Sequence, residues 1–249
     1  MSSLADRVSE ARPVETPRTH RWGFGAFVLV FAVFLLSAVL IGAIAQLESP
    51  GAGISVPVAL IGSIIPPVLA AGVALLVTVL RGNGPRIDLR WSWSWVDVRV
   101  GLRFGLIGLV CTTAAAFLWT KIVGERNASS ALGQLVDNQR LPLIAAITMF
   151  LFIWLIGPIC EEIIYRGLLW GALERLNWGR WIVFGLTTVI FAVSHLEPMR
   201  TVLLLVIAIP IGLARLVTGR LGASIVAHQI NNFLPALAVL LIALDVMPA

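Results

Sequence analysis

Ionisable side chains recur at short spacings in the second half of an otherwise apolar chain. Glu161 and Glu162 are adjacent, and Arg166 follows the second glutamate by four residues. Residues four apart share a helix face, so Glu162 and Arg166 can form an ion pair that lets a buried carboxylate stay charged. Glu161 is rotated from that pair by about 100° on a helix, which leaves its carboxylate free to act as a general base.

Two of the three histidines of the chain lie further along, in segments that are also apolar. His228 and Asn232 are four residues apart, so an imidazole and an amide face the same point and can donate hydrogen bonds to a developing oxyanion. His195 can hold or polarise a water beside Glu161. A general base, a water-orienting histidine and two hydrogen-bond donors are the groups that hydrolysis of an amide requires.

The chain around these residues has the composition of a membrane protein. Of its 249 residues, 59% are hydrophobic and 12% are charged, and the mean hydropathy is +0.95. The polar surface is too small to cover a water-soluble globule. We therefore predict an all-α fold, a polytopic transmembrane bundle of about seven to eight helices. Ionisable groups at membrane depth are costly, which makes the polar residues above candidates for function.

Seven apolar stretches approach the length of about 20 residues that a helix needs to cross a bilayer. They cover residues 23–45, 56–80, 100–119, 142–164, 181–195, 201–218 and 221–244. With the N-terminus inside, 13 of the 18 Lys and Arg residues fall in inner regions, which the positive-inside rule favours. We expect a multi-pass protein of the cell membrane with a cytoplasmic N-terminus. This orientation explains the net charge of +5 without a nucleic-acid partner.

The chain is expected to divide into a short tail and one membrane domain. Residues 1–22 are polar and contain few large apolar side chains, which predicts a flexible cytoplasmic tail. Residues 23–249 form the transmembrane domain. Arg200, between two predicted helices, and Arg215, within one, are expected to be anchors at the membrane interface.

The position of the glutamates along their helix raises a difficulty. Pro158 lacks a backbone N–H, so it is expected to free the Trp154 carbonyl and to kink the helix just before the glutamates. If this helix ends at residue 164, Glu161 falls near its inner end, whereas His195 lies roughly 21 Å along the next helix. A helix extended toward Leu173 would bring the two residues to closer depths.

Three short motifs follow one another on successive predicted helices: Glu-Glu-x-x-x-Arg at 161–166, Phe-x-x-x-His at 191–195 and His-x-x-x-Asn at 228–232. In this order they resemble the CPBP family of intramembrane proteases, also called the CAAX protease and bacteriocin-processing or Abi family, which includes the Ras-converting CAAX endopeptidase. The resemblance covers residues 157–232. It implies that the bundle, over 23–249, encloses a polar chamber open to the cytoplasmic side. A peptide bond of a membrane-associated peptide or lipidated protein is hydrolysed there.

The resemblance also implies a role for each motif position. One glutamate activates water with a histidine partner, a glutamate–arginine pair supports the site, and the third motif stabilises the oxyanion. In that order, the residues are Glu161 and His195, Glu162 and Arg166, and His228 and Asn232. The family is often labelled metalloprotease, but this chain lacks a His-Glu-x-x-His helix and its candidate ligands are scattered. We favour a glutamate-type mechanism without a cofactor, with a zinc enzyme as the alternative.

Two other classes of function fit part of the pattern. A proton-coupled transporter also places glutamate, histidine and asparagine in membrane helices, but it predicts repeat symmetry that the sequence does not display. A non-catalytic membrane scaffold or immunity protein of the same fold would keep the helices and act by binding a partner. The intact motifs favour the protease over both.

Overall fold

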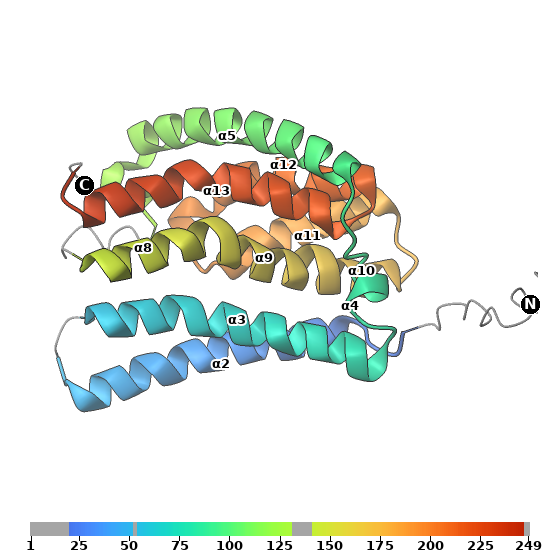
Figure 1. Ribbon diagram of the computed structural model, residues 1–249, viewed down its shortest axis with the longest axis horizontal. Coiled ribbons are helices and arrows are strands. Elements are labelled where there is room, and N and C mark those ends of the chain that lie inside the picture. The colour runs from blue at the N-terminus through green and yellow to red at the C-terminus, as the bar shows by residue number, and fades with distance from the viewer. Residues whose placement is uncertain (1–19, 52–53, 131–140, 247–249) are drawn as a thin grey trace, which may run out of the picture.

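The computed structural model describes residues 20–51, 54–130 and 141–246 as a bundle of helices, and these residues contain no β-strand (Figure 1). Six described helices are long and apolar enough to cross a membrane, and a seventh apolar helix is shorter. The predicted all-α membrane bundle is confirmed. The elements are α2 (Phe24–Glu48), α3 (Val56–Arg81), α4 (Pro85–Asp88), α5 (Trp95–Val123), α6 (Glu125–Ala128), α8 (Leu143–Leu151), η1 (Phe152–Ile156), α9 (Gly157–Glu162), η2 (Ile163–Leu169), α10 (Trp170–Glu174), α11 (Arg180–Ser194), η3 (Pro198–Arg200), α12 (Thr201–Thr218) and α13 (Leu221–Ala243).

The elements from α8 to α10 form one unbroken helical run, Leu143–Glu174, of 32 residues. The predicted end at residue 164 is wrong. Neighbouring helices bury the residues that follow, and this tertiary packing stabilises the helix as far as Glu174. At about 1.5 Å per residue the run is roughly 48 Å long, and Glu161 lies about 20 Å from its Glu174 end. This extension resolves the mismatch in depth between the glutamates and His195.

The long run lies in the middle of the bundle (Figure 1). The pair α2 and α3 packs on one side of it, and α13 packs on the other. Helix α5 covers α12 and α13, and α11 packs against α12. The central run therefore contacts helices from both halves of the chain, which is how it positions its polar side chains inside the bundle.

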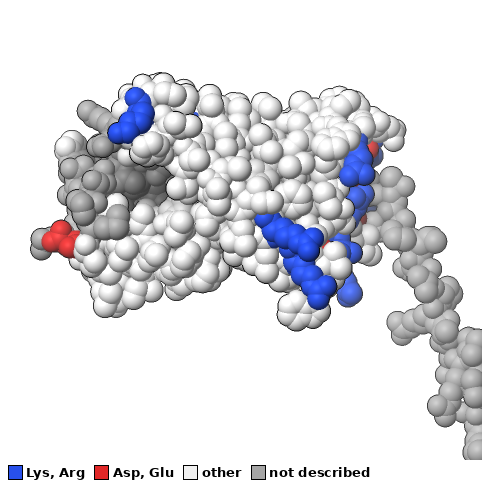
Figure 2. Space-filling view, turned by 90° about the horizontal axis from the view of Figure 1, so that it is seen from above, with Lys and Arg blue, Asp and Glu red and all other residues white. Residues whose placement is uncertain are grey.

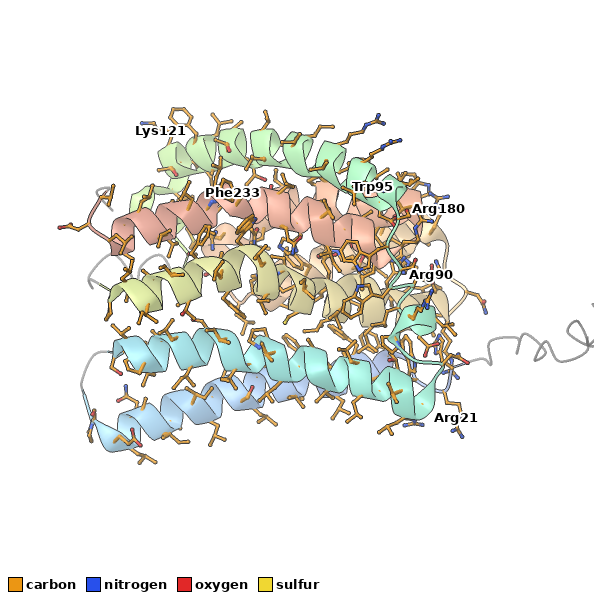
Figure 3. All side chains as sticks on the ribbon, viewed as in Figure 1. Arg21, Arg90, Trp95, Lys121, Arg180 and Phe233 are labelled. Atoms are coloured by element: carbon orange, nitrogen blue, oxygen red, sulfur yellow. The ribbon has the colours of Figure 1, made fainter. Side chains whose placement is uncertain are left out.

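Basic side chains gather over one end of the bundle and along the adjoining surface (Figure 2). Arg21, Arg90 and Arg180 lie at this end, which we call the basic end, whereas Lys121 lies at the opposite or far end (Figure 3). This gathering of basic residues at one end agrees with the count of Lys and Arg from which a cytoplasmic N-terminus was predicted. The orientation itself stays a prediction. Four of the basic residues counted there lie outside the described residues: Arg7, Arg12, Arg18 and Arg140.

The chain just before α2 is anchored at the basic end. Trp22 is only 2% exposed, and its Nε1 donates a hydrogen bond of 2.9 Å to Asp88 Oδ2. Arg175 Nη1 donates to the Trp22 carbonyl at 2.6 Å. Most of the predicted flexible tail, residues 1–19, lies outside the described residues, but residues 20–22 belong to the packed domain.

Close packing of α5 against α13 depends on glycine. A Cβ atom added to Gly101 would lie 2.6 Å from the Val226 Cβ and 2.7 Å from the Ala223 carbonyl oxygen. Small residues let membrane helices approach closely and gain van der Waals contact. The same interface holds a buried hydrogen bond of 3.0 Å from Thr112 Oγ1 to Asn231 Oδ1.

Gly101→Ala is therefore expected to destabilise the protein by about 1–3 kcal/mol, because the added methyl group meets backbone and cannot be accommodated by a rotamer change alone. The measurement is the midpoint of thermal unfolding in detergent. Gly72→Ala on α3 is the matched control, since no atom lies within 4 Å of its added Cβ. Equal midpoints for the two variants would contradict this account of the interface.

Candidate functional site

The helix that carries the glutamates, α9, lies between two π-helical turns, η1 and η2. Such turns are rare and are frequently found at functional sites. In η1 the Gly157 N–H donates to the Phe152 carbonyl, five residues back. Pro158 has no N–H to continue this register, which leaves the Ile153 carbonyl free, and Asn232 Nδ2 donates to it at 3.2 Å. In an α-helix the N–H that Pro158 lacks would have bonded the Trp154 carbonyl. In the π turn each N–H bonds the carbonyl five residues back, so the carbonyl left free by Pro158 is that of Ile153.

Side chains from α12 and α13 bond two further carbonyls of the central run. Gln229 Nε2 donates to the Leu155 carbonyl at 3.3 Å. Arg215 Nε donates to the Arg166 carbonyl at 3.0 Å, and its guanidinium lies 5.4 Å from the centre of the Trp170 ring. Arg215 is 1% exposed, so the predicted interfacial anchor is wrong. The Arg166 carbonyl that accepts this hydrogen bond belongs to the π turn η2.

Glu162 and Arg166 form the ion pair expected from their spacing. Arg166 Nη1 lies 3.0 Å from Glu162 Oε1, and both side chains are 0% exposed. Arg166 also donates from Nη2 to the Ala208 carbonyl at 3.2 Å, and its guanidinium stacks 4.4 Å from the centre of the Phe191 ring. The pair joins the central run to α11 and α12.

The same carboxylate oxygen of Glu162 orients His228. His228 Nδ1 lies 3.0 Å from Glu162 Oε1. Since a carboxylate only accepts, Nδ1 carries the hydrogen, and the other ring nitrogen, Nε2, points to Glu161. The distance from His228 Nε2 to Glu161 Oε2 is 3.7 Å.

His195 approaches Glu161 from α11. Its Nε2 lies 4.0 Å from Glu161 Oε2, and the two side chains are 27% and 29% exposed. His195 Nδ1 donates to the Phe191 carbonyl at 2.7 Å, so the neutral ring carries its lone pair on Nε2, facing the carboxylate. A separation of 4.0 Å is too long for a direct hydrogen bond and suits one bridging water.

The structure therefore brings five of the six predicted residues into direct contact or close approach: Glu161, Glu162, Arg166, His195 and His228. The sixth, Asn232, lies one turn beyond His228 on α13 and uses one amide hydrogen on the Ile153 carbonyl. One N–H of that amide remains for another acceptor.

Two further residues build the site, and sequence reasoning gave neither of them a role. The Phe191 ring lies 4.6 Å from the His195 ring and 5.8 Å from the His228 ring, between centroids. The Tyr165 hydroxyl lies 2.5 Å from Ser194 Oγ, directly before His195 in the chain. Phe191 is the first position of the Phe-x-x-x-His motif, but the motif assigned no contact to its ring, and Tyr165 is the single tyrosine of the chain.

The geometry gives limited support to a metal site. Among the residues that the structure describes, no group of three or more His, Cys, Asp or Glu side chains is placed to hold a metal ion. Glu161 with the two histidines comes nearest, but the 3.7 and 4.0 Å separations exceed the about 3.4 Å between ligands of a tetrahedral zinc. As placed, these three side chains lie too far apart to be the ligands of one tetrahedral zinc ion.

One family model matches this part of the chain. Residues 143–234 match the model described as Type II CAAX prenyl endopeptidase Rce1-like. The matched segment begins with α8, ends within α13 and contains all six predicted site residues. No curated protein and no solved structure matches the chain.

Proposed function

Because the chain belongs to the CAAX protease (CPBP) family through residues 143–234, we propose that it is an intramembrane endopeptidase whose hydrolytic water is activated by Glu161. The observation that carries this proposal is the Glu161 carboxylate facing the Nε2 atoms of two histidines at 3.7 and 4.0 Å inside a helical bundle. The substrate is a peptide segment held at the membrane, lipidated or not.

The first step uses Glu161 and His195. A water between Glu161 Oε2 and His195 Nε2 donates one hydrogen to each atom, so its oxygen is oriented for attack. Glu161 takes the proton as the water oxygen bonds to the carbonyl carbon of the peptide. The product is a tetrahedral intermediate with a negative oxygen.

His228 is placed to stabilise that oxygen. When both of its ring nitrogens are protonated, Nδ1–H donates to Glu162 and Nε2–H is available to the oxyanion. Glu162 carries one negative charge between the positive ring and Arg166, so the three groups have a net charge of +1, which favours the oxyanion. Collapse of the intermediate breaks the C–N bond, and protonated Glu161 returns its proton to the leaving amine.

The proposal is tested with a quenched fluorescent peptide library that includes prenylated members, incubated with purified protein in detergent. Cleavage that continues in the presence of a chelator is the expected result. Cleavage that the chelator abolishes and added zinc restores would replace the glutamate-type mechanism with the zinc alternative. Absence of cleavage by folded protein across the library would favour the non-catalytic scaffold.

A further inference from the structure

The first third of α5 carries two arginines on the outer surface of the bundle. Arg99 and Arg103 are four residues apart, so they share one face of the helix, and both are exposed. Leu102 and Leu106, beside them on this face, are 40% and 55% exposed. Figure 2 looks onto this side of the bundle and shows basic side chains that extend from the basic end along the surface. The two arginines therefore interrupt a face that is otherwise suited to lipid.

No acidic side chain of the described ranges neutralises either arginine, and neither guanidinium has a hydrogen-bond partner there. The single acidic residue of α5, Asp97, is 0% exposed and accepts hydrogen bonds of 2.8 and 3.0 Å from Arg220 Nε. Helices α12 and α13, which pack along α5, contain no acidic residue. The positive charge of Arg99 and Arg103 is thus left for an anion from outside the chain.

The depth of the arginines in the membrane suggests which anion this is. Trp95 is 77% exposed and lies at the basic end of α5 (Figure 3). Exposed tryptophans of membrane proteins lie at the level of the lipid headgroups, so Arg103, roughly 12 Å further along the helix, starts beneath that level. A long arginine side chain reaches back toward the headgroups, where phosphates are its partners. Two guanidiniums one turn apart can share the oxygens of one phosphate, which they recognise through paired N–H groups.

The segment before α5 forms a second wall beside the arginines. The Trp93 ring is held against α13, since a Cβ atom added to Gly222 would lie 3.2 Å from Trp93 Cε3. Arg99 follows Trp95 by one helical turn, so the two tryptophans lie next to the arginine face. An open hollow of about 300 Å³ lies at this point, and it is lined by Trp93, Ser94, Trp95 and Val98.

We propose that Arg99 and Arg103, with the hollow beside them, bind the headgroup of an anionic phospholipid at the basic end of α5. The two guanidiniums bind the phosphate, the indoles of Trp93 and Trp95 contact the rest of the headgroup, and the exposed leucines of the same face contact the acyl chains. The predicted orientation places this face in the cytoplasmic leaflet, whose surface is negative. The site lies on the outer surface of α5, so lipid binding does not depend on the proposed protease activity.

Lipid titration followed by native mass spectrometry measures this binding without any turnover. The purified full chain in a neutral detergent is titrated with phosphatidylglycerol or with phosphatidylcholine, and the apparent Kd of the first bound lipid is read from the bound fraction. The test variant combines Arg99→Gln with Arg103→Gln. The matched control combines Arg81→Gln with Arg86→Gln, which removes the same charge from two other exposed arginines.

The apparent Kd for phosphatidylglycerol is expected to rise about 30-fold in the test variant, because each arginine at an anionic surface contributes about a factor of five. The control variant should bind this lipid as the unsubstituted protein does, and phosphatidylcholine should bind more weakly to all three. An equal loss in the control variant, or equal affinity of the unsubstituted protein for the two lipids, would overturn the proposal. Release of bound phosphatidylglycerol by excess inorganic phosphate would identify a site for the free ion instead.

The hollow and the fold are checked separately. Trp95→Leu keeps both charges and is expected to raise the Kd for phosphatidylglycerol, and an unchanged Kd would remove the hollow from the site. The unfolding midpoints of all variants in lipid-free detergent should equal that of the unsubstituted protein, because the replaced side chains are exposed. Loss of lipid at an unchanged midpoint then reports the site and not the fold.

Discussion

Glu161→Gln is expected to lower kcat for peptide cleavage by about 10²–10⁴-fold, the range that a positioned general base contributes. Glutamine keeps the size and shape of the side chain but cannot accept the proton of the water. The unfolding midpoint should not change, because Glu161 is 29% exposed and its carboxylate lies 3.7 Å or more from both histidines. Initial rates and thermal unfolding in the same detergent provide both readouts.

Glu48→Gln is the matched control for this variant. Glu48 is the last residue of α2 and is exposed, so the same loss of one carboxylate occurs away from the site. Its cleavage rate should equal that of the unsubstituted protein. Equal rates for Glu161→Gln and Glu48→Gln would remove Glu161 from the mechanism.

Arg166→Met is expected to destabilise the fold by about 3–5 kcal/mol, since it leaves the Glu162 carboxylate charged and buried without its cationic partner. Both side chains of the pair are 0% exposed, so water cannot replace the arginine. The measurement is the free energy of unfolding in mixed micelles. Arg99→Met, on the exposed surface of α5, is the control and should differ from the unsubstituted protein by less than about 0.5 kcal/mol.

A double variant separates the loss of the ion pair from the loss of packing. Glu162→Gln combined with Arg166→Met removes both charges, so its destabilisation should be smaller than the sum of the two single effects. Strict additivity would show that the two side chains do not stabilise one another. The residual loss in the double variant reports the packing of Arg166 and its hydrogen bond to the Ala208 carbonyl.

The sequence allowed the membrane spans and the ion pair to be predicted, because both depend on local periodicity. A run of about 20 apolar residues is recognisable without knowledge of its neighbours. Glu162 and Arg166 share a face of any helix that contains them. The approach of His195 and His228 to Glu161 was inferred from chemistry and motif order, and the structure shows this approach directly.

Other features depend on tertiary packing and could not be predicted from spacing. The central run continues to Glu174 because other helices enclose its last turns, namely α2, α3, α11, α12 and α13. The two π turns are stabilised by side chains from distant segments, such as Arg215 on the Arg166 carbonyl. Trp22 belongs to a segment with the composition of a tail, and a single hydrogen bond to Asp88 helps to fix it in the core. Composition averages over a window and does not detect one anchored residue.

Hydrolysis by water that Glu161 activates is tested most directly by the new peptide ends that the protein produces in heavy-oxygen water. Purified protein and its Glu161→Gln variant, each in proteoliposomes, are incubated with the same peptide library, and products are identified by mass spectrometry. We predict new carboxyl ends that carry one heavy oxygen atom with the unsubstituted protein, formed about 10²–10⁴-fold more slowly by the variant. The same labelled ends, formed at the same rate by Glu161→Gln, would contradict the assignment of Glu161 as the general base.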